Sequence, residues 1–174
     1  MLEDVRRTLE GWTHPDPRQI ALRDAYLTHL DEHPDGIWRS CSAGHITAST
    51  LVLDADRSRV LLTLHPKVGR WLQLGGHLEP EDVALRAAAL REAVEEGGIA
   101  DVSISARPVR LDRHPVPCGG SLNEHLDVQF LGIVPVGSRA VRSDESDDLR
   151  WFAVDSLPDV DASVRALIDD ALRG

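Results

Sequence analysis

The first part of the chain repeats apolar positions with the spacing of an α-helix. Leu2, Val5 and Leu9 recur at intervals of three and four residues, which puts them on one helical face. Two prolines within residues 13–17 break this pattern, and apolar positions resume between residues 20 and 30. We therefore predict two helices joined by a short turn.

Beyond residue 44 the pattern changes to runs of β-branched and apolar residues, which favour strands. These runs predict strands at residues 45–56, 59–65, 101–112, 125–134 and 149–154. Helical periodicity returns at residues 83–98, which are rich in Ala, Leu, Glu and Arg and end in two glycines, and again at residues 161–172. Residues 69–82 and 114–124 are predicted to be turn-rich loops.

This order of elements predicts an α/β fold in which a mixed sheet carries helices on both faces. We divide the chain into a helical appendage at residues 1–36 and a main domain at residues 37–174. The appendage is too short to bury a core of its own, so we expect it to pack on the main domain. A homodimer formed through these helices, or a lid, is an alternative.

The charge balance limits the partners of the protein. The 174 residues include 29 Asp and Glu against 19 Lys and Arg, which gives a formal net charge of −10. Such a surface disfavours nucleic acid and anionic membranes, whereas a bound metal ion can still hold a small phosphorylated ligand.

Two further features point to a cytoplasmic protein. No apolar run is long enough to span a bilayer, and the N-terminus lacks the pattern of a signal peptide. The two cysteines, Cys41 and Cys118, do not have the spacing of a zinc site or a disulfide framework. Whether they pair with each other is left open by the sequence.

The helix that ends in two glycines concentrates like charges. Glu92, Glu95 and Glu96 lie off its apolar stripe, and carboxylates three and four residues apart repel one another on a helix. Carboxylate oxygens on adjacent turns suit Mg²⁺ or Mn²⁺ shared with substrate phosphates, and a solvated acidic face is the alternative. A glycine pair before the helix and the neighbouring Arg91, which can fix a glutamate rotamer, favour the metal site.

The segment GGHLEPEDVALRAAALREAVEEGGI resembles the signature of the Nudix hydrolases. That signature is G-x5-E-x7-R-E-U-x-E-E-x-G-U, where U is an aliphatic residue, and its second half matches REAVEEGGI. In the first half, the spacing from Gly76 leads to Asp82 in place of a glutamate. The spacing back from the arginine leads to Val83, because the segment holds one extra residue. Asp82 or Glu81 then takes the place of the first glutamate.

The resemblance extends over roughly residues 40–172 and implies the α/β/α sandwich of the Nudix family. It also implies hydrolysis of a nucleoside diphosphate linked to another moiety, with Mg²⁺ as the cofactor and Mn²⁺ as the alternative. The partner is then a nucleotide-type small molecule. By resemblance, the metal ligands are Gly76, Asp82, Glu92, Glu95 and Glu96. The same three glutamates, together with Arg91, which orients them, are the implied catalytic residues.

The general base stays open among Glu95, Glu124 and Glu145. The last two belong to acidic segments that can instead be plain surface, and either can add a metal ligand. Further candidates for contact with the substrate are Glu124, His45, His77 and His125. For the histidines, a satisfied structural role is the alternative.

Two other functions are compatible with the resemblance. The first is a binding module of the Nudix fold that holds a nucleotide without cleaving it, which the departure at Val83 supports. The second is an isomerase of isoprenoid diphosphates, which would need a thiol opposite an acid. Cys118, in a segment rich in Pro and Gly, fits that requirement poorly.

Overall fold

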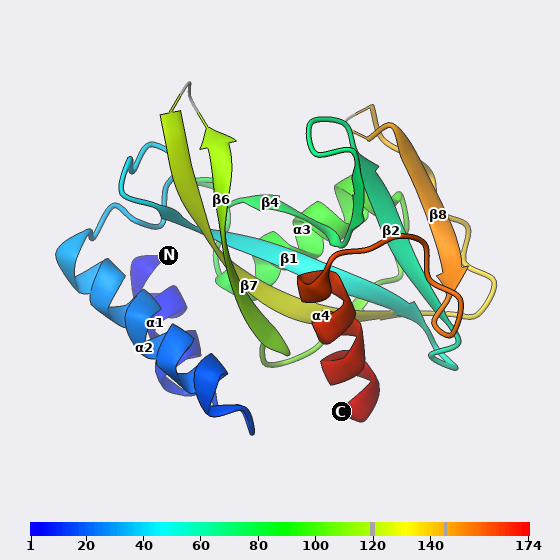
Figure 1. Cartoon of the computed structure of the whole chain (residues 1–174), viewed down its shortest axis with the longest axis horizontal. Helices are drawn as coiled ribbons and strands as arrows, with labels where there is room; N and C mark the ends of the chain where they lie inside the picture. Colours follow the sequence, from blue (N-terminus) through cyan, green and yellow to red (C-terminus); the bar gives the residue numbers. More distant parts are fainter. Residues whose placement is uncertain (119–120, 145) are drawn as a thin grey trace.

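The computed structural model describes residues 1–118, 121–144 and 146–174. Eight strands form one mixed sheet, shown in Figure 1. The strands are β1 His45–Asp54, β2 Arg59–His65, β3 Arg70–Leu72, β4 Leu74–His77, β5 Ser103–Ile104, β6 Arg110–Cys118, β7 Ser121–Val134 and β8 Asp148–Ala153. The helices are α1 Leu2–Glu10, α2 Pro17–Glu32, α3 Leu85–Gly97 and α4 Ala162–Arg173. Within the described ranges, no helix is both long and apolar enough to cross a membrane.

Strand β1 is the centre of the sheet. It runs parallel to β7, with His45 opposite His125 and Thr47 opposite Asp127. Its other edge is shared by two strands: β4 pairs with residues 47–50 of β1, and β2 pairs with the residues that follow. Strand β2 also pairs with β3 and β8, and β7 also pairs with β5 and β6. Since side chains alternate along a strand, β1 and β7 divide their residues between two faces.

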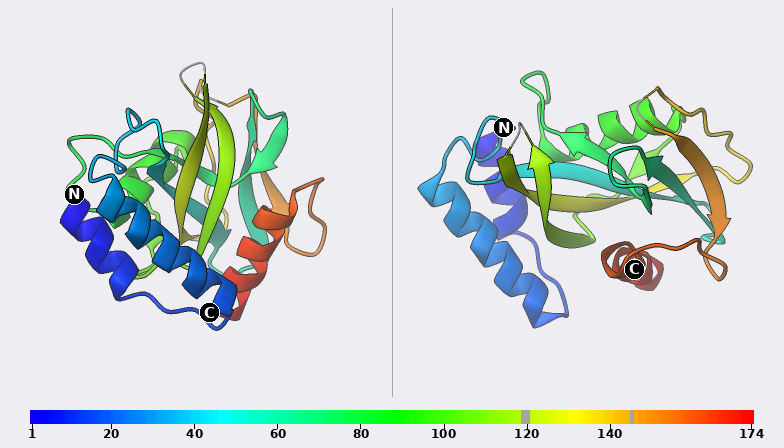
Figure 2. Two further views of the ribbon diagram at one scale, coloured as in Figure 1. Left: turned by 60° about the vertical axis from the view of Figure 1, so that its left-hand side comes forward. Right: turned by 45° about the horizontal axis from the view of Figure 1, so that its top comes forward.

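The two faces of the sheet pack against different helices, as Figure 2 shows. On one face, Ala48 packs in a core with Leu85 and Ala89 of α3, and this core also includes residues of α1 and α2. On the other face, Leu51 packs with Leu167 of α4. The predicted α/β fold, with a mixed sheet between helices, is confirmed.

The helices α1 and α2 lie together beside β6 and β7 (Figure 1). Buried hydrogen bonds join this segment to the rest of the chain, and in one of them the Trp12 indole donates to the Pro108 carbonyl at 2.7 Å. In another contact, the N–H of Leu85 donates to the Asp4 carboxylate at 2.8 Å. Because the N-cap residue of α3 is Ala84, which has no polar side chain, Asp4 supplies the cap from α1. The N-terminal helices therefore help to place α3.

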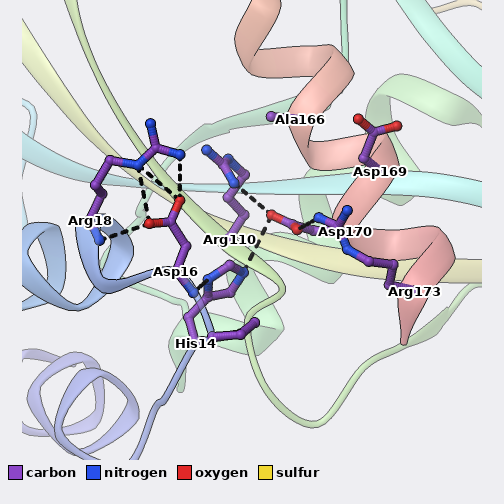
Figure 3. Close-up of a pocket in the computed structure, with 9 residues that line it drawn as sticks. His14, Asp16, Arg18, Arg110, Ala166, Asp169, Asp170 and Arg173 are labelled. Atoms are coloured by element: carbon purple, nitrogen blue, oxygen red, sulfur yellow. Dashed lines mark hydrogen bonds and ion pairs between the residues drawn. The ribbon is translucent and has the colours of Figure 1, made fainter.

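A hollow of about 240 Å³ lies where α4 meets β6 and the turn before α2 (Figure 3). Asp170 of α4 accepts a hydrogen bond from Arg110 of β6 at 2.6 Å and also pairs with Arg173. The imidazole of His14 lies 3.4 Å from the same carboxylate, which is only 6% exposed. Because Asp170 is paired with Arg110 and Arg173 and lies beside His14, we interpret the hollow as a packing contact between the N-terminal segment, the sheet and α4.

Two predicted loops are wrong. Residues 69–82 contain β3 and β4, which are too short to show a period in the sequence. Residues 114–124 contribute to the paired ends of β6 and β7, where Pro115 lies opposite Glu124. Among the described strands, β6 pairs only with β7, so its prolines lie on an edge strand, where a missing N–H is tolerated. The single strand predicted at residues 101–112 is divided between β5 and β6.

Candidate active site

The helix α3 brings two of its carboxylates against the glycine pair of β4. The N–H of Gly75 donates to Glu96 Oε2 at 2.9 Å. Gly76 faces Glu92 so closely that a Cβ added to it would stand 2.7 Å from Glu92 Oε1. On the other side of the strand, a Cβ added to Gly75 would stand 2.4 Å from the Cβ of Ser49. Gly75 therefore requires glycine, because an added Cβ would meet the backbone and Cβ of β1, whereas at Gly76 an added Cβ would displace the end of the Glu92 side chain.

The guanidinium of Arg91 joins the acidic side chains of this region. Its Nε and Nη2 donate to the two oxygens of Asp82 at 3.0 and 2.9 Å. Its Nη1 donates to Glu92 at 2.9 Å and to Glu95 at 3.0 Å, and Nη2 also donates to the carbonyl of His77 at 3.0 Å. The hydrogen bonds to Asp82 are the main cause that raises the pKa of Arg91, so this side chain stays charged.

Asp82 faces Arg91, and both of its oxygens are engaged there. Its carboxylate is 5% exposed and also accepts a hydrogen bond from the N–H of Glu79 at 2.8 Å. Burial acts to raise the pKa of Asp82, but the hydrogen bonds from Arg91 and from Glu79 outweigh it and lower the pKa. The extra residue of the motif, Val83, is 85% exposed before α3 begins, and Glu81 is exposed in the same loop. The contacts of Asp82 suit a residue that orients Arg91, and its role as a metal ligand stays a prediction.

The surroundings of Glu92 and Glu96 fit a divalent cation that prefers oxygen ligands. The close approach of Gly76 to Glu92 leaves room for no side chain between the strand and the carboxylate. Glu95 lies at the solvent side, with 58% of its side chain exposed. Carboxylates of this kind, with backbone oxygens nearby, are the donor set of Mg²⁺ and Mn²⁺ sites.

A second polar region occupies the opposite face of β4 and β1, and its centre was not predicted from the sequence. Asp127 of β7 is buried and accepts hydrogen bonds from the hydroxyls of Thr47 and Ser49 at 2.9 and 2.6 Å. The amides of Gln73 and Gln129 donate to it as well, at 3.3 and 3.1 Å. Burial is the largest effect on the pKa of Asp127 and raises it. The alternation of polar and apolar residues in HITAST and HLDVQF is the signal that could have indicated this polar face.

Next to Asp127, three of the predicted residues come together from three strands. We call His45 of β1, His77 of β4 and His125 of β7 the histidine cluster. The centroids of their rings lie 4.8 to 5.1 Å apart. Burial lowers the pKa of all three side chains, to about 4 for His77 and to about 3 for His125. The imidazoles are therefore neutral at physiological pH.

The histidine cluster holds ring nitrogens without a hydrogen-bond partner among the described residues. They are both nitrogens of His45 and the Nε2 atoms of His77 and His125. A buried polar atom left unpaired costs about 1–3 kcal/mol. The ring nitrogens of the cluster are therefore available to bind a hydrogen-bonding group or a metal ion.

The remaining predicted residues lie apart from this arrangement. Glu124, on β7, pairs with Arg113 of β6 at 3.0 Å and makes no described contact with α3. Glu145 lies outside the described residues. The structure thus brings together the motif residues on one side of β4 and the three histidines on the other, with Glu124 on the β6–β7 hairpin.

Comparison with known protein families gives one description that covers this fold and site. The model of the NUDIX domain matches residues 44–171. This match spans most of the chain, so the chain belongs to the Nudix family, a class of enzymes that hydrolyse phosphoric anhydride bonds. A comparison with curated proteins finds no significant match.

Solved structures of this family share the fold at low sequence identity. A NUDIX-family hydrolase from Clostridium perfringens is 21% identical, with a TM-score of 0.60 over 74% of this chain and 96% of that one. The dihydroneopterin triphosphate pyrophosphohydrolase of E. coli is 16% identical, with the same TM-score and coverage. The NUDIX domain of Shewanella oneidensis NrtR, solved with ADP ribose, is 17% identical, with a TM-score of 0.57 over 74% of this chain and 86% of that one.

Proposed function

We propose that the protein is a pyrophosphohydrolase that cleaves a nucleoside diphosphate linked to another moiety, with Mg²⁺ as cofactor and Mn²⁺ as the alternative. The observation that carries this proposal is the meeting of Glu92 and Glu96 with the glycine pair of β4. The proposed metal ligands are Glu92 and Glu96 with the backbone of Gly76. The cytoplasmic location and the homodimer stay predictions from the sequence.

Each residue of the site has a distinct task in this reaction. When bound, a divalent cation offsets the charge of the substrate phosphates and lowers the pKa of the attacking water. Arg91 fixes the rotamers of Glu92 and Glu95 through its hydrogen bonds. The N–H of Gly75 holds Glu96 against β4.

We assign the role of general base to Glu95, because it joins the network of Arg91 while most of its side chain faces solvent. A carboxylate in this position can accept the proton of the attacking water. Glu124 and Glu145 stay the alternative bases that the sequence suggests. The substrate class is a nucleotide derivative, as with the ADP ribose bound by one structural relative.

The test is the release of phosphate or pyrophosphate from a panel of nucleotides, nucleotide sugars and ADP-ribose. It is run with Mg²⁺, with Mn²⁺ and with a chelator, on the wild type, on Glu96→Gln and on Glu32→Gln. Glu32 is an exposed glutamate at the end of α2 and serves as the matched control. We expect turnover that needs the metal, a loss of about a hundredfold or more in Glu96→Gln, and no change in Glu32→Gln.

Two results would contradict the proposal. If no compound is turned over but one raises the melting temperature, the alternative of a non-catalytic binding module is favoured. If Glu96→Gln retains full activity, the chemistry does not depend on the carboxylates of α3. The isomerase alternative predicts activity on an isoprenoid diphosphate without release of phosphate, and the thiol of Cys118 lies outside the described side chains.

A further inference from the structure

We propose that His45, His77 and His125 form a second metal site, which binds one divalent transition-metal ion of the Zn²⁺ type through three imidazole nitrogens. This site is distinct from the carboxylates of α3 and does not depend on the function proposed for them. One ligand nitrogen from each histidine lies within 4.8 Å of the other two. The three residues come from β1, β4 and β7, so the folded sheet alone brings them together.

The register of the sheet holds the three histidines on one face. His45 lies directly opposite His125 across the parallel pair of β1 and β7. His77 lies opposite Thr47 across the antiparallel pair of β1 and β4, and Thr47 is two residues from His45. Ligands fixed by regular strands are positioned more accurately than ligands on loops.

The burial of these side chains places polar ring nitrogens where a bound ion could engage them. His45 is 0% exposed, and its ring nitrogens make no hydrogen bond of good geometry with the described residues, although the backbone of Cys41 lies near the ring. The Nε2 atoms of His77 and His125 are also buried without a partner. Buried polar atoms in native proteins are almost always paired, and several unpaired nitrogens around one point indicate an ion.

The donor set selects the kind of metal. Imidazole nitrogen suits Zn²⁺ and related transition metals, whereas Mg²⁺ prefers oxygen. In a tetrahedral site with Zn–N bonds of about 2.0–2.1 Å, the nitrogens are roughly 3.3 Å apart. Because the nitrogens lie within 4.8 Å of one another, the cluster needs to contract by at most about 1.5 Å to hold the ion. Three protein ligands leave the fourth position for water or for an oxygen of a bound molecule.

The charges around the cluster are compatible with this site. Burial lowers the pKa of His77 and His125 most, the neighbouring histidines add to this and Arg39 contributes less, so the imidazoles are neutral, which is the form that binds a metal. Arg39 itself is exposed, so solvent screens its repulsion of a cation. On the same face, the carboxyl group of Asp127 lies two residues from His125. His114, whose ring lies 5.5 Å from that of His125, is paired with Asp112 at 2.7 Å.

The test is a titration of the metal-free protein with Zn²⁺ by calorimetry, in the presence of excess Mg²⁺. Mg²⁺ occupies oxygen sites, so the heat reports the nitrogen site. Co²⁺ is used as a second probe, because a four-coordinate Co²⁺ ion absorbs visible light strongly. The variants are His77→Gln and His125→Gln. The control is His33→Gln, since His33 belongs to the other group of ligand atoms that lie close together, with Asp35 and Cys41.

We expect one Zn²⁺ per wild-type chain and a rise in melting temperature of roughly 5–10 °C at a hundredfold excess over Kd. Affinity should fall at least about a hundredfold in His77→Gln and in His125→Gln, while His33→Gln binds as the wild type does. The circular dichroism of each metal-free variant verifies that it is folded.

Three outcomes would overturn the proposal. The first is the absence of Zn²⁺ binding by the folded wild type. The second is binding that disappears in His33→Gln and survives in the two cluster variants. The third is weak binding of several ions that no single substitution alters. None of these results depends on turnover, so a failure here leaves the hydrolase proposal to be judged by its own assay.

Discussion

Replacement of Arg91 by lysine tests whether its hydrogen bonds organise the acidic side of the site. Lysine keeps the positive charge, but its ammonium group has no planar fork and cannot reach both oxygens of Asp82 together with the other partners. The wild-type guanidinium makes five hydrogen bonds to Asp82, Glu92, Glu95 and the carbonyl of His77. We therefore expect Arg91→Lys to lose stability although the charge is conserved.

The magnitude follows from the exposure of each partner. A hydrogen bond to a buried charged group contributes about 1.5–3 kcal/mol, and an exposed ion pair about 0.2–1 kcal/mol. Asp82 is 5% exposed and Glu95 is 58% exposed, so the bonds to Asp82 dominate. Since Arg91 itself is 21% exposed, we take the lower end of these ranges. Loss of one bond to Asp82, the bond to the His77 carbonyl and the bond to Glu95 then lowers the free energy of unfolding by about 2–3 kcal/mol.

Urea unfolding at neutral pH without added metal is the assay. With a slope of about 2 kcal/mol per molar urea, the midpoint of Arg91→Lys should fall by about 1 to 1.5 M. Arg18→Lys is the matched control. Arg18 also donates hydrogen bonds from two nitrogens to an aspartate, Asp16, but its side chain is 88% exposed. Its midpoint should not move measurably. A midpoint for Arg91→Lys equal to that of the control would refute the reasoning, as would unchanged turnover, since Glu95 without its hydrogen bond from residue 91 should lower the rate at least about tenfold.

Two further substitutions test other contacts. In Gly76→Ala, the added methyl group meets the end of a flexible carboxylate, so we expect turnover to fall by about a hundredfold while the melting temperature changes little; equal losses of both would argue against a local effect. In Asp170→Asn, removal of a buried charge leaves Arg110 without its partner, and the free energy of unfolding at pH 7 should fall by about 2–3 kcal/mol. Burial raises the pKa of Asp170, but the hydrogen bonds from Arg110 and Arg173 outweigh it and lower the pKa below 3.8. The advantage of the wild type over Asp170→Asn should therefore be present above pH 4 and disappear as the pH falls through the lowered pKa, which unfolding of both proteins over a series of pH values from 7 downward would measure.

The sequence predicts the parts of this fold whose signals are local. The helix with Glu92, Glu95 and Glu96 follows from composition and its terminal glycines, and strand β1 follows from its β-branched residues. Strand β4 was missed because four residues, two of them glycine, have no strand propensity of their own. Strand β4 forms through its pairing with β1, which is a tertiary contact. In this pair Gly75 lies directly against Ser49.

The polar face formed by β1, β4 and β7 also depends on strand pairing that no local sequence signal predicts. His45 and His125 were identified one by one at the starts of predicted strands, and nothing in one sequence gives the register of two strands that are far apart in the chain. That register is what brings His125 beside His45 and Asp127 beside Thr47. The buried carboxyl group of Asp127 is stabilised by partners from three segments of the chain, so no local pattern could mark it as a central residue.

The position of the extra motif residue explains how β4 can face the carboxylates of α3 on one side and the histidine cluster on the other. Successive residues of β4 point to opposite faces, so Gly76 meets the carboxylates of α3 while the side chain of His77 joins the histidine cluster. An insertion within β4 would exchange these faces, because a shift of one residue reverses every side chain. The extra residue instead lies at Val83, in the loop before α3, where it projects into solvent. There Asp82 still reaches Arg91, so the loop absorbs the insertion and the glutamates still meet the strand.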